Sequence, residues 1–376
     1  MISKKQVVFV NQSAGYLMID IIAAFAEVAE ERILMTGYLN PRNNALDAVV
    51  KVEKLASYDR SSSFRRLTTW AMAFVKTLFL IKFKYPKAHL FLVSNPPFSS
   101  LIPLFCKNTY DLLVYDIYPD ALVEFKYFKE KSWIIRKWEQ ANRKVYSQAH
   151  NVYTITEGMK ARLSKYIEAD AIRVVPVWTD NHFLQPIMKK QNVFLKKHHL
   201  QDKFIVMYSG NMGKSHPVEI LVELANRMQD IINLHFLLIG GGDKYRALEL
   251  RISELKLENI SIMPWQPTQD LPFTLSAADL ALVTVGREAS DLSIPSKTYN
   301  LMSAGVPIIC IAPKNSALAK LVLNESLGEV FESNQVDLVE DFIKKHQLQP
   351  LLLEKLAENA LIASEKYSVE NAKQFL

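Results

Sequence analysis

Short apolar runs alternate along the chain with longer segments in which apolar residues recur at helical spacing. The first series of runs predicts strands over Gln6–Val10, Arg32–Thr36, His89–Val93, Leu112–Tyr115, Asn151–Thr154 and Arg173–Val175. The second predicts strands over Ile205–Tyr208, His235–Ile239, Ile260–Met263, Leu280–Val283 and Ile308–Ile311. Helices are expected over Asp20–Glu30, Trp133–Gln148, Pro217–Met228, Lys244–Leu255, Ser296–Ser303 and Leu351–Lys366. Strands that alternate with helices indicate parallel sheets with helices on both faces.

The two series are separated by the polar, irregular stretch Trp178–Leu200. This break predicts two doubly wound α/β domains of Rossmann type that face a central cleft. We place the first at residues 1–180 and the second at residues 200–364. Ligands of open parallel sheets bind at the carboxyl ends of the strands, so function is expected where a strand passes into the next helix.

Composition narrows the class of protein. The chain has 376 residues, of which 49% are hydrophobic, as expected for two globular domains. Its two cysteines, Cys106 and Cys310, are far apart in the sequence and suggest neither a disulfide framework nor a zinc site. The first residues do not resemble a secretory signal, and no apolar stretch has the length of a transmembrane helix. We therefore expect a cytoplasmic protein.

Positive charge is concentrated in the first half of the chain. Residues 1–185 contain 25 Lys and Arg and 17 Asp and Glu, and Arg60–Tyr110 contains eight basic residues and no acidic one. No nucleic-acid-binding motif accompanies this charge. A membrane surface or a phosphorylated lipid is therefore the expected anionic partner, rather than nucleic acid.

The segment Arg60–Lys87 mixes basic with aromatic residues. Its candidate contacts for an acceptor or a membrane are Arg65, Arg66, Trp70 and Lys76. The segment fits a helix that lies on an anionic lipid surface. It equally fits a core helix of the first domain with basic ends in solvent.

The first candidate motif is YSGNMGKSH, Tyr208–His216, at the end of a predicted strand. Its glycines allow a ligand to approach the backbone closely, and Lys214 adds a positive charge before the next helix. Together with Asn211 and Gly213 these residues suit a diphosphate. An ordinary turn that uses glycine for its geometry is the alternative.

Two further motifs follow the next two strands. Gly240–Gly242 form either a structural turn or a ligand contact. Trp265, followed by Gln266, can stack on a nucleobase or can simply close a loop.

The fourth motif, Ile294–Cys310, reads IPSKTYNLMSAGVPIIC. Proline and Ser296 are favoured at the start of a helix, and Lys297 and Asn300 are three residues apart and so share one face. A helix start with free amides, a hydroxyl and a lysine is suited to binding an anion. Glu288 or Asp291, in the preceding loop, can accept hydrogen bonds from sugar hydroxyls.

On these motifs the chain resembles the retaining glycosyltransferases of family 4, which have the GT-B fold, and in particular bacterial enzymes of capsule, O-antigen or exopolysaccharide synthesis. The resemblance covers nearly the whole chain. It is carried by SNPPFSSL, VYDIYPDALVE, YSGNMGKSH and IPSKTYNLMSAGVP, in that order. It implies that the last segment, residues 365–376, returns to the first domain.

The resemblance also implies roles for individual residues. Lys214 and Lys297 would neutralise the diphosphate of a nucleotide sugar, with backbone amides near Gly213 and Ser296 binding its oxygens. Trp265 and Gln266 would lie beside the base, and Asn300 would face the ribose. Asp116 would face the donor sugar and the acceptor. UDP is the expected nucleotide, and no metal or other cofactor is expected.

Two departures from the family pattern stand out. Many members have two glutamates separated by seven residues, whereas this chain has Leu292 and Asn300 at those positions. Glu288 and Asp291 therefore remain the candidates for contact with the donor sugar. The first loop, NQSAGY, keeps only Gly15 of the glycines often found there.

The predicted function is transfer of a sugar, with retention, to a lipid-linked or saccharide acceptor at the inner face of the cell membrane. Lys297, Lys214 and Glu288, together with Asp116, are the candidate catalytic residues. A GT-B-fold sugar-nucleotide 2-epimerase and a non-catalytic protein with the same fold are the alternatives.

Overall fold

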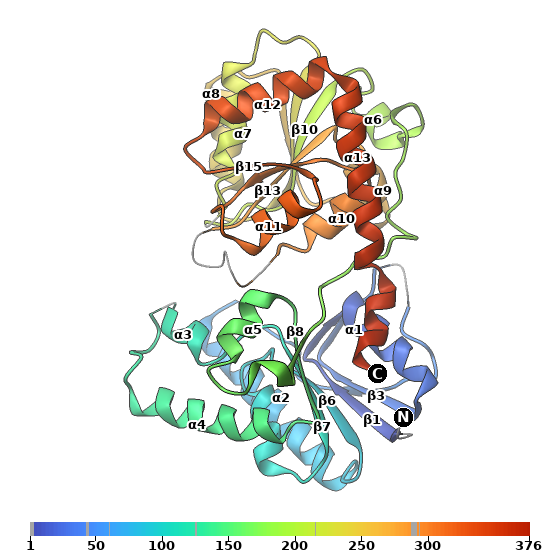
Figure 1. Cartoon of the computed structure of the whole chain (residues 1–376), viewed down its shortest axis with the longest axis vertical. Coiled ribbons are helices and arrows are strands. Elements are labelled where there is room, and N and C mark those ends of the chain that lie inside the picture. The colour runs from blue at the N-terminus through green and yellow to red at the C-terminus, as the bar shows by residue number, and fades with distance from the viewer. Residues whose placement is uncertain are drawn as a thin grey trace. The chain divides into compact units, whose positions relative to one another are not determined.

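The computed structural model describes residues 4–42, 45–59, 61–124, 126–214, 216–286, 292 and 294–376. The chain forms two compact units (Figure 1). Unit 1 contains Met1–Pro176 and Glu370–Leu376, and unit 2 contains Val177–Val369.

Unit 1 is built on a parallel sheet with the strand order β5-β3-β1-β6-β7-β8-β9. Its strands are β1 (Lys4–Val10), β3 (Ala29–Thr36), β5 (Lys51–Lys54), β6 (His89–Val93), β7 (Tyr110–Val114), β8 (Asn151–Thr154) and β9 (Ile172–Val174), and the short pair β2 (Ser13–Gly15) and β4 (Tyr38–Asn40) forms a separate sheet. Its helices are α1 (Tyr16–Ala24), η1 (Phe25–Glu27), α2 (Ser63–Phe83), η2 (Ser99–Phe105), α3 (Asp120–Glu124), α4 (Trp133–Gln148), α5 (Glu157–Leu163) and η3 (Ala169–Ala171).

Unit 2 is built on a second parallel sheet, with the order β12-β11-β10-β13-β14-β15. Its strands are β10 (Phe204–Asn211), β11 (Leu234–Gly241), β12 (Ile260–Met263), β13 (Leu280–Thr284), β14 (Ile308–Ile311) and β15 (Gly328–Phe331). Its helices are η4 (Lys189–Gln191), α6 (Val193–Lys197), α7 (Glu219–Arg227), α8 (Tyr245–Glu254), η5 (Thr268–Asp270), α9 (Leu271–Leu275), α10 (Lys297–Ser303), α11 (Ala317–Asn324), α12 (Val336–Leu348), α13 (Pro350–Ser364) and η7 (Glu365–Tyr367); η8 (Val369–Phe375) then enters unit 1.

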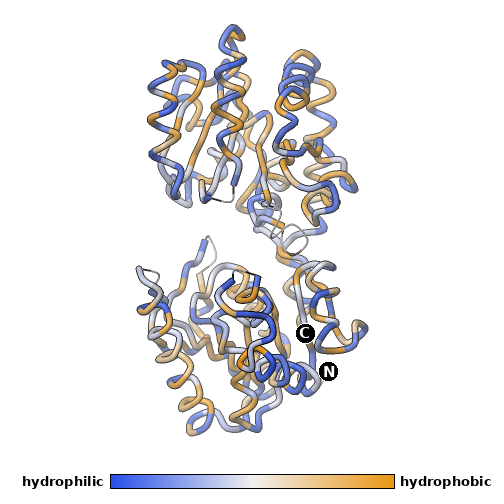
Figure 2. The backbone as a smooth tube through the Cα atoms, turned by 90° about the vertical axis from the view of Figure 1, so that its left-hand side faces the viewer, coloured by the Kyte–Doolittle hydropathy of each residue, from blue (hydrophilic) through white to orange (hydrophobic). Residues whose placement is uncertain are grey.

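The hydrophobic pattern explains these layers. The central strands β6, β7 and β13 are buried along their whole length, as expected for parallel strands covered on both faces. Hydrophobic and hydrophilic positions alternate along the helices (Figure 2), which therefore bury one face each. The sequence prediction of two Rossmann-like sheets is confirmed.

The structure adds elements that the sequence pattern did not predict. β5 has the sequence KVEK and β15 the sequence GEVF, and both are edge strands with partly exposed residues. Edge strands need no continuous apolar run, so their sequences give a weak signal. The predicted helix Asp20–Glu30 is too long at its end, because residues from Ala29 onward pair with β1.

The polar stretch that separates the two predicted series of strands, Trp178–Leu200, is part of unit 2 in the structure. Trp178, Leu184 and Asn192 are buried there. The Asn192 side chain caps α6 by accepting hydrogen bonds from two backbone N–H groups.

The last seven residues belong to unit 1. The Phe375 ring is buried against Phe91 and Tyr153, with ring centroids 5.7 and 4.8 Å away. The Tyr153 hydroxyl donates to the Phe375 carbonyl over 3.3 Å.

Candidate functional site

Glycines allow close contact between β10 and β11 at their carboxyl ends. Gly210 pairs with Gly240, and a β-carbon at position 240 would lie 1.9 Å from the Gly210 carbonyl oxygen. Gly240 also has a φ of +143°, which other residues rarely adopt. At the ends of these strands the backbone is therefore not covered by side chains of its own. We call this surface, formed by Gly210 and Gly240–Gly242, the glycine floor.

The turn after β10 is held by several hydrogen bonds. The Tyr208 hydroxyl donates to the Asn211 carbonyl over 2.6 Å, and the Met212 N–H donates to the Gly241 carbonyl over 2.7 Å. The Asn211 side chain lies so close to Gly242 that a β-carbon there would be 2.5 Å from Oδ1. These contacts give the glycines of both motifs a structural reason to be present.

Lys297 extends from the first turn of α10 to this floor. Its Nζ lies 3.7 Å from the centroid of the Tyr208 ring and would be 2.6 Å from a β-carbon at Gly210. Within the described part of the chain, this buried Nζ has no hydrogen-bond partner. Burial lowers the pKa of Lys297 to about 7. The neighbouring Ser296 is exposed, and its side chain does not cap α10.

A cavity of ≈ 810 Å³ opens at the carboxyl ends of β10, β13, β14 and β15. Three lysines line it, Lys214, Lys244 and Lys314, together with Glu219 and Glu332. Lys244 is already engaged, because its Nζ lies 2.7 Å from the His216 carbonyl oxygen and 2.6 Å from the Glu219 carboxylate. The Lys214 side chain is exposed on the rim of this cavity.

His216 lies near Lys297 and Lys244. Its Nδ1 is 3.2 Å from the Thr284 hydroxyl. Burial, followed by the charges of Lys297 and Lys244, lowers the pKa of His216. The imidazole is therefore neutral at pH 7 and adds no charge of its own.

Trp265 lies beside the glycine floor. A β-carbon at Gly241 would be 2.8 Å from the indole Nε1, so the absence of a side chain at Gly241 makes room for the ring. The Trp265 side chain is 60% exposed, which leaves it accessible to a planar ligand. Gln266 donates from Nε2 to the Pro264 carbonyl over 2.9 Å.

Asn300 is buried on α10, and its Oδ1 accepts a hydrogen bond from the Thr179 hydroxyl over 2.7 Å. Its amide thus contacts the start of unit 2. Glu288 and Asp291, the candidate contacts for the donor sugar, lie outside the described residues.

In unit 1, Asp116 lies two residues after the end of β7. The Ser94 hydroxyl accepts hydrogen bonds from the backbone N–H groups of Tyr115 and Asp116, both over 3.0 Å. Burial raises the pKa of the Asp116 carboxyl. Gly15 ends β2 and precedes α1, and a β-carbon there would meet only the Asn40 carbonyl, at 4.0 Å.

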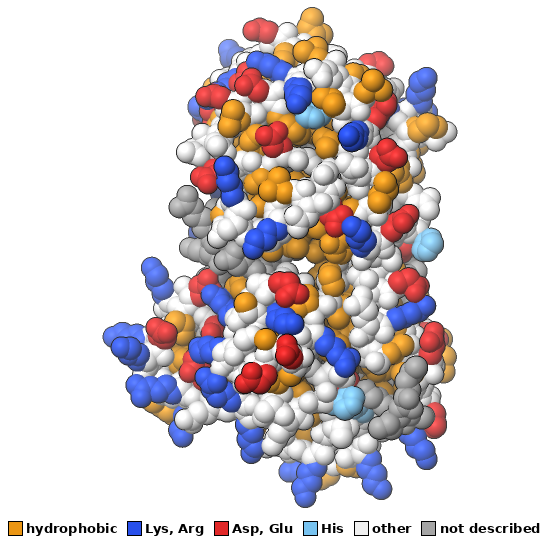
Figure 3. Space-filling model, viewed as in Figure 1, with side chains coloured by type: hydrophobic (Ala, Val, Ile, Leu, Met, Phe, Trp, Pro, Cys, Tyr) orange, Lys and Arg blue, Asp and Glu red, His pale blue; other side chains and the backbone are white. Residues whose placement is uncertain are grey.

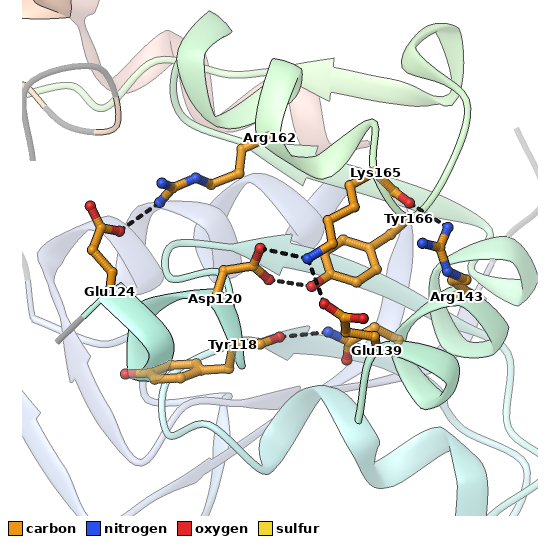
Figure 4. Close-up of polar contacts among 9 residues, drawn as sticks. Tyr118, Asp120, Glu124, Glu139, Arg143, Arg162, Lys165 and Tyr166 are labelled. Carbon is orange, nitrogen blue, oxygen red and sulfur yellow. Dashed lines mark hydrogen bonds and ion pairs between the residues drawn. The ribbon is translucent and has the colours of Figure 1, made fainter. Parts of the chain in front are cut away.

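A polar network supports the loop that carries Asp116 (Figure 4). Asp120 accepts hydrogen bonds from Tyr166 and from Lys165, whose Nζ also lies 2.5 Å from Glu139 on α4. Arg162 on α5 pairs with Glu124 over 2.8 Å. The network fixes α3 against α4 and α5, and so fixes the end of the DIYPD loop.

The helix predicted as a membrane contact is α2. Ser62 caps its start by accepting from the Arg65 N–H over 3.2 Å. Exposed apolar side chains recur along it at helical spacing: Phe64, Leu67, Met72, Val75, Phe79 and Phe83. Arg65 and Lys76 are exposed as well. The helix therefore presents an apolar stripe and basic residues to solvent.

Trp70 lies on a different side of α2. It stacks on Tyr58 with centroids 5.8 Å apart and has Arg66 5.6 Å from its ring centroid. Lys and Arg side chains also gather over the α3–α4 side of unit 1 (Figure 3). None of the helices in the described ranges meets the length and hydropathy of a membrane span.

The structure thus gathers Asn211, Gly213, Trp265 and Lys297 around the glycine floor, with Lys214 in the adjoining cavity. Sequence reasoning missed Tyr208 and Lys244 as parts of this site. Tyr208 is the first residue of the YSGNMGKSH motif, but its place at the end of a predicted apolar strand indicated only a core position. Lys244 follows the three glycines and could have been found there as a second lysine after a strand.

Comparisons with known proteins relate this chain to glycosyltransferases. Residues 189–362 match the family model of glycosyl transferases group 1. The probable glycosyltransferase WbjE of Pseudomonas aeruginosa is 22% identical over 58% of this chain and 54% of its own length. The putative colanic acid biosynthesis glycosyl transferase WcaI of Escherichia coli K12 is 29% identical over 46% of this chain and 44% of its own length. The aligned region thus spans about half of each curated relative.

Solved structures show the same fold over the whole chain. The Anabaena protein Alr3699/HepE, in complex with UDP and glucose, superposes with a TM-score of 0.70 at 15% identity, covering 99% of this chain and 98% of that one. WaaG, a glycosyltransferase involved in lipopolysaccharide biosynthesis, also gives 0.70 at 15% identity and covers 98% of each chain. The chain has the GT-B fold, and its second unit carries a glycosyl transferases group 1 domain.

Proposed function

We propose that the protein is a glycosyltransferase that takes its sugar from a nucleotide-sugar donor. One observation carries the proposal: the Lys297 amine, which has no hydrogen-bond partner among the described residues, and an exposed tryptophan lie against the glycine floor, and three lysines line a cavity at the carboxyl ends of the same parallel sheet. A diphosphate needs cations and close backbone approach, and a base needs a flat apolar surface. All of these are present in unit 2.

In this proposal, Lys297 and Lys214 stabilise the leaving diphosphate by electrostatics already in position. Trp265 and Gln266 lie beside the base, and Asn300, whose Oδ1 accepts a hydrogen bond from Thr179, faces the ribose. UDP is favoured over GDP because similar structures hold UDP or UDP-glucose. Family 4 membership, retention and independence of metal remain part of the proposal, as does contact of Glu288 or Asp291 with the sugar.

We propose a lipid-linked or saccharide acceptor of surface polysaccharide synthesis, which meets the donor sugar near Asp116. The support comes from the side chains that α2 exposes. The apolar stripe and basic residues of α2 suit an anionic membrane surface, where a polyprenyl-diphosphate acceptor would lie. The protein would then be a peripheral protein of the inner membrane face.

A donor screen tests this function. UDP- and GDP-sugars are mixed with the protein, and thermal shift and sugar products are measured. We expect stabilisation by UDP-sugars that is lost in Lys297→Ala and kept in Lys320→Ala, an exposed lysine on α11. Formation of a 2-epimer would show an epimerase instead, and failure of every nucleotide sugar to bind would refute the proposed donor site.

A further inference from the structure

The end of the Lys297 side chain lies in a closed, largely apolar place. Its Nζ is 3.7 Å from the Tyr208 ring centroid and lies against Gly210, and no described residue accepts a hydrogen bond from it. A buried ammonium without water or an anion is unstable. The site is therefore incomplete until an anion enters it.

The groups that face this amine are few. β10 contributes Tyr208, whose buried hydroxyl donates to Asn211, and burial raises its pKa above the ordinary value. The loop after β10 contributes His216, whose pKa is lowered by burial and by the charges of Lys297 and Lys244. The Lys244 Nζ lies 2.7 Å from the His216 carbonyl oxygen. Among the charged residues that the structure describes, no carboxylate pairs with Lys297. Burial accordingly lowers the pKa of Lys297 to about 7.

We propose that Lys297 takes up a proton from solvent when the donor diphosphate binds, and that Tyr208 is the residue that positions its amine. This inference rests on the proposed donor site. The diphosphate supplies the missing counter-ion, so the bound state favours the ammonium form. The free protein holds a substantial fraction of neutral amine at neutral pH, and binding converts it.

Tyr208 is suited to position this amine because it is fixed at both ends. Its side chain is fully buried in the core of unit 2, and its hydroxyl is tied to the turn at Asn211. The face of its aromatic ring attracts a cation electrostatically, which a buried aliphatic side chain in the same position would not do. Tyr208→Phe keeps the ring and loses the hydroxyl, whereas Tyr208→Leu loses both.

Calorimetry of UDP binding in buffers of different ionisation enthalpy measures the protons taken up. At pH 8 the terminal phosphate of UDP, with a pKa of about 6, is already ionised and contributes little. We expect the wild type to take up close to one proton more than Lys297→Arg, because arginine keeps the positive charge that binds the diphosphate but is already protonated before binding. This difference should shrink toward zero at pH 6.

Tyr208→Leu should weaken UDP binding by about 3- to 30-fold and Tyr208→Phe by much less, as expected if the ring face carries the ammonium. Equal weakening by both would overturn the role of the ring. UDP binding with the same proton uptake in the wild type and in Lys297→Arg would overturn the inference but leave the proposed function intact. No binding of UDP or GDP to the wild type would overturn both.

Discussion

At the residue scale, the site depends on glycines, whose lack of a side chain leaves room for neighbouring groups. Gly210 leaves room for the Lys297 amine, and Gly240 leaves room for the Gly210 carbonyl. The Lys297 amine is buried without a counter-ion among the residues that the structure describes, which costs folding free energy in the absence of ligand. A residue kept under such conditions is a candidate for function rather than for stability.

Replacing Lys297 should therefore stabilise the free protein while removing activity. Lys297→Met should unfold at a higher temperature than the wild type at pH 7, and its kcat/KM should fall by about 100- to 1,000-fold. Circular dichroism melts and product assays measure the two effects. Loss of stability together with activity would indicate that Lys297 serves mainly the fold.

The same lysine predicts a pH dependence. Its folded-state pKa of about 7 lies below the value of about 10.4 in an unfolded chain, so the unfolded state binds more protons between these values. Wild-type stability should therefore rise with pH in this window by up to about 1.4 kcal/mol per unit relative to Lys297→Met. Chemical denaturation of both proteins from pH 7 to 10 measures this. A gap between them that stays constant over this range would contradict the assigned burial of the amine.

The glycine floor gives a matched pair of substitutions. Gly240→Ala should cost several kcal/mol of unfolding free energy, because its β-carbon would lie 1.9 Å from a backbone oxygen at a φ of +143°. Gly15→Ala should be tolerated, because its nearest neighbour is 4.0 Å away. Urea denaturation compares them, and similar losses for the two variants would argue against the close approach of β10 and β11.

At the scale of elements, α2 differs from the other helices of unit 1. It has 21 residues, and it leaves large apolar side chains in solvent along its whole length. Of the two sequence interpretations, the exposed stripe favours an interfacial helix, although Ala73, Thr77 and Ile81 on its other face are buried in unit 1. The helix thus packs on the unit with one face and is available to a partner with the other.

The exposed stripe of α2 can be tested without disturbing the core. The double substitution Val75→Asp and Phe79→Asp should abolish flotation with anionic vesicles and leave thermal stability nearly unchanged, since both side chains are more than half exposed. Ile232→Asp, at an 87% exposed apolar position of unit 2, is the control and should float like the wild type. Unaltered flotation of the α2 variant would exclude this helix as the membrane contact.

At the scale of the whole molecule, the sequence predicted the two sheets well because buried parallel strands have continuous apolar runs. It could not predict where the Lys297 amine ends, since that depends on Tyr208, 89 positions earlier in the sequence. The contact between Asn300 and Thr179 joins residues 121 positions apart, so the sequence pattern could not predict it either. Motif spacing thus predicted the candidate site residues, whereas the burial and the neighbours of the Lys297 amine depend on long-range packing.

The return of the chain to unit 1 was implied by the resemblance and has an energetic consequence. Phe375→Ala should destabilise unit 1 by about 3–5 kcal/mol, because the ring is buried against Phe91 and Tyr153. Lys373→Ala, in the same segment but partly exposed, should have little effect. Thermal melts of both variants test this, and an unaffected Phe375→Ala would mean that unit 1 does not need its last segment.

The most direct test of the central claim is a crystal structure of the protein with UDP. We expect the diphosphate over Gly210, with an oxygen about 3 Å from the Lys297 Nζ, and the uracil ring beside Trp265. UDP bound away from the glycine floor, with the Lys297 amine still unpaired, would contradict the account.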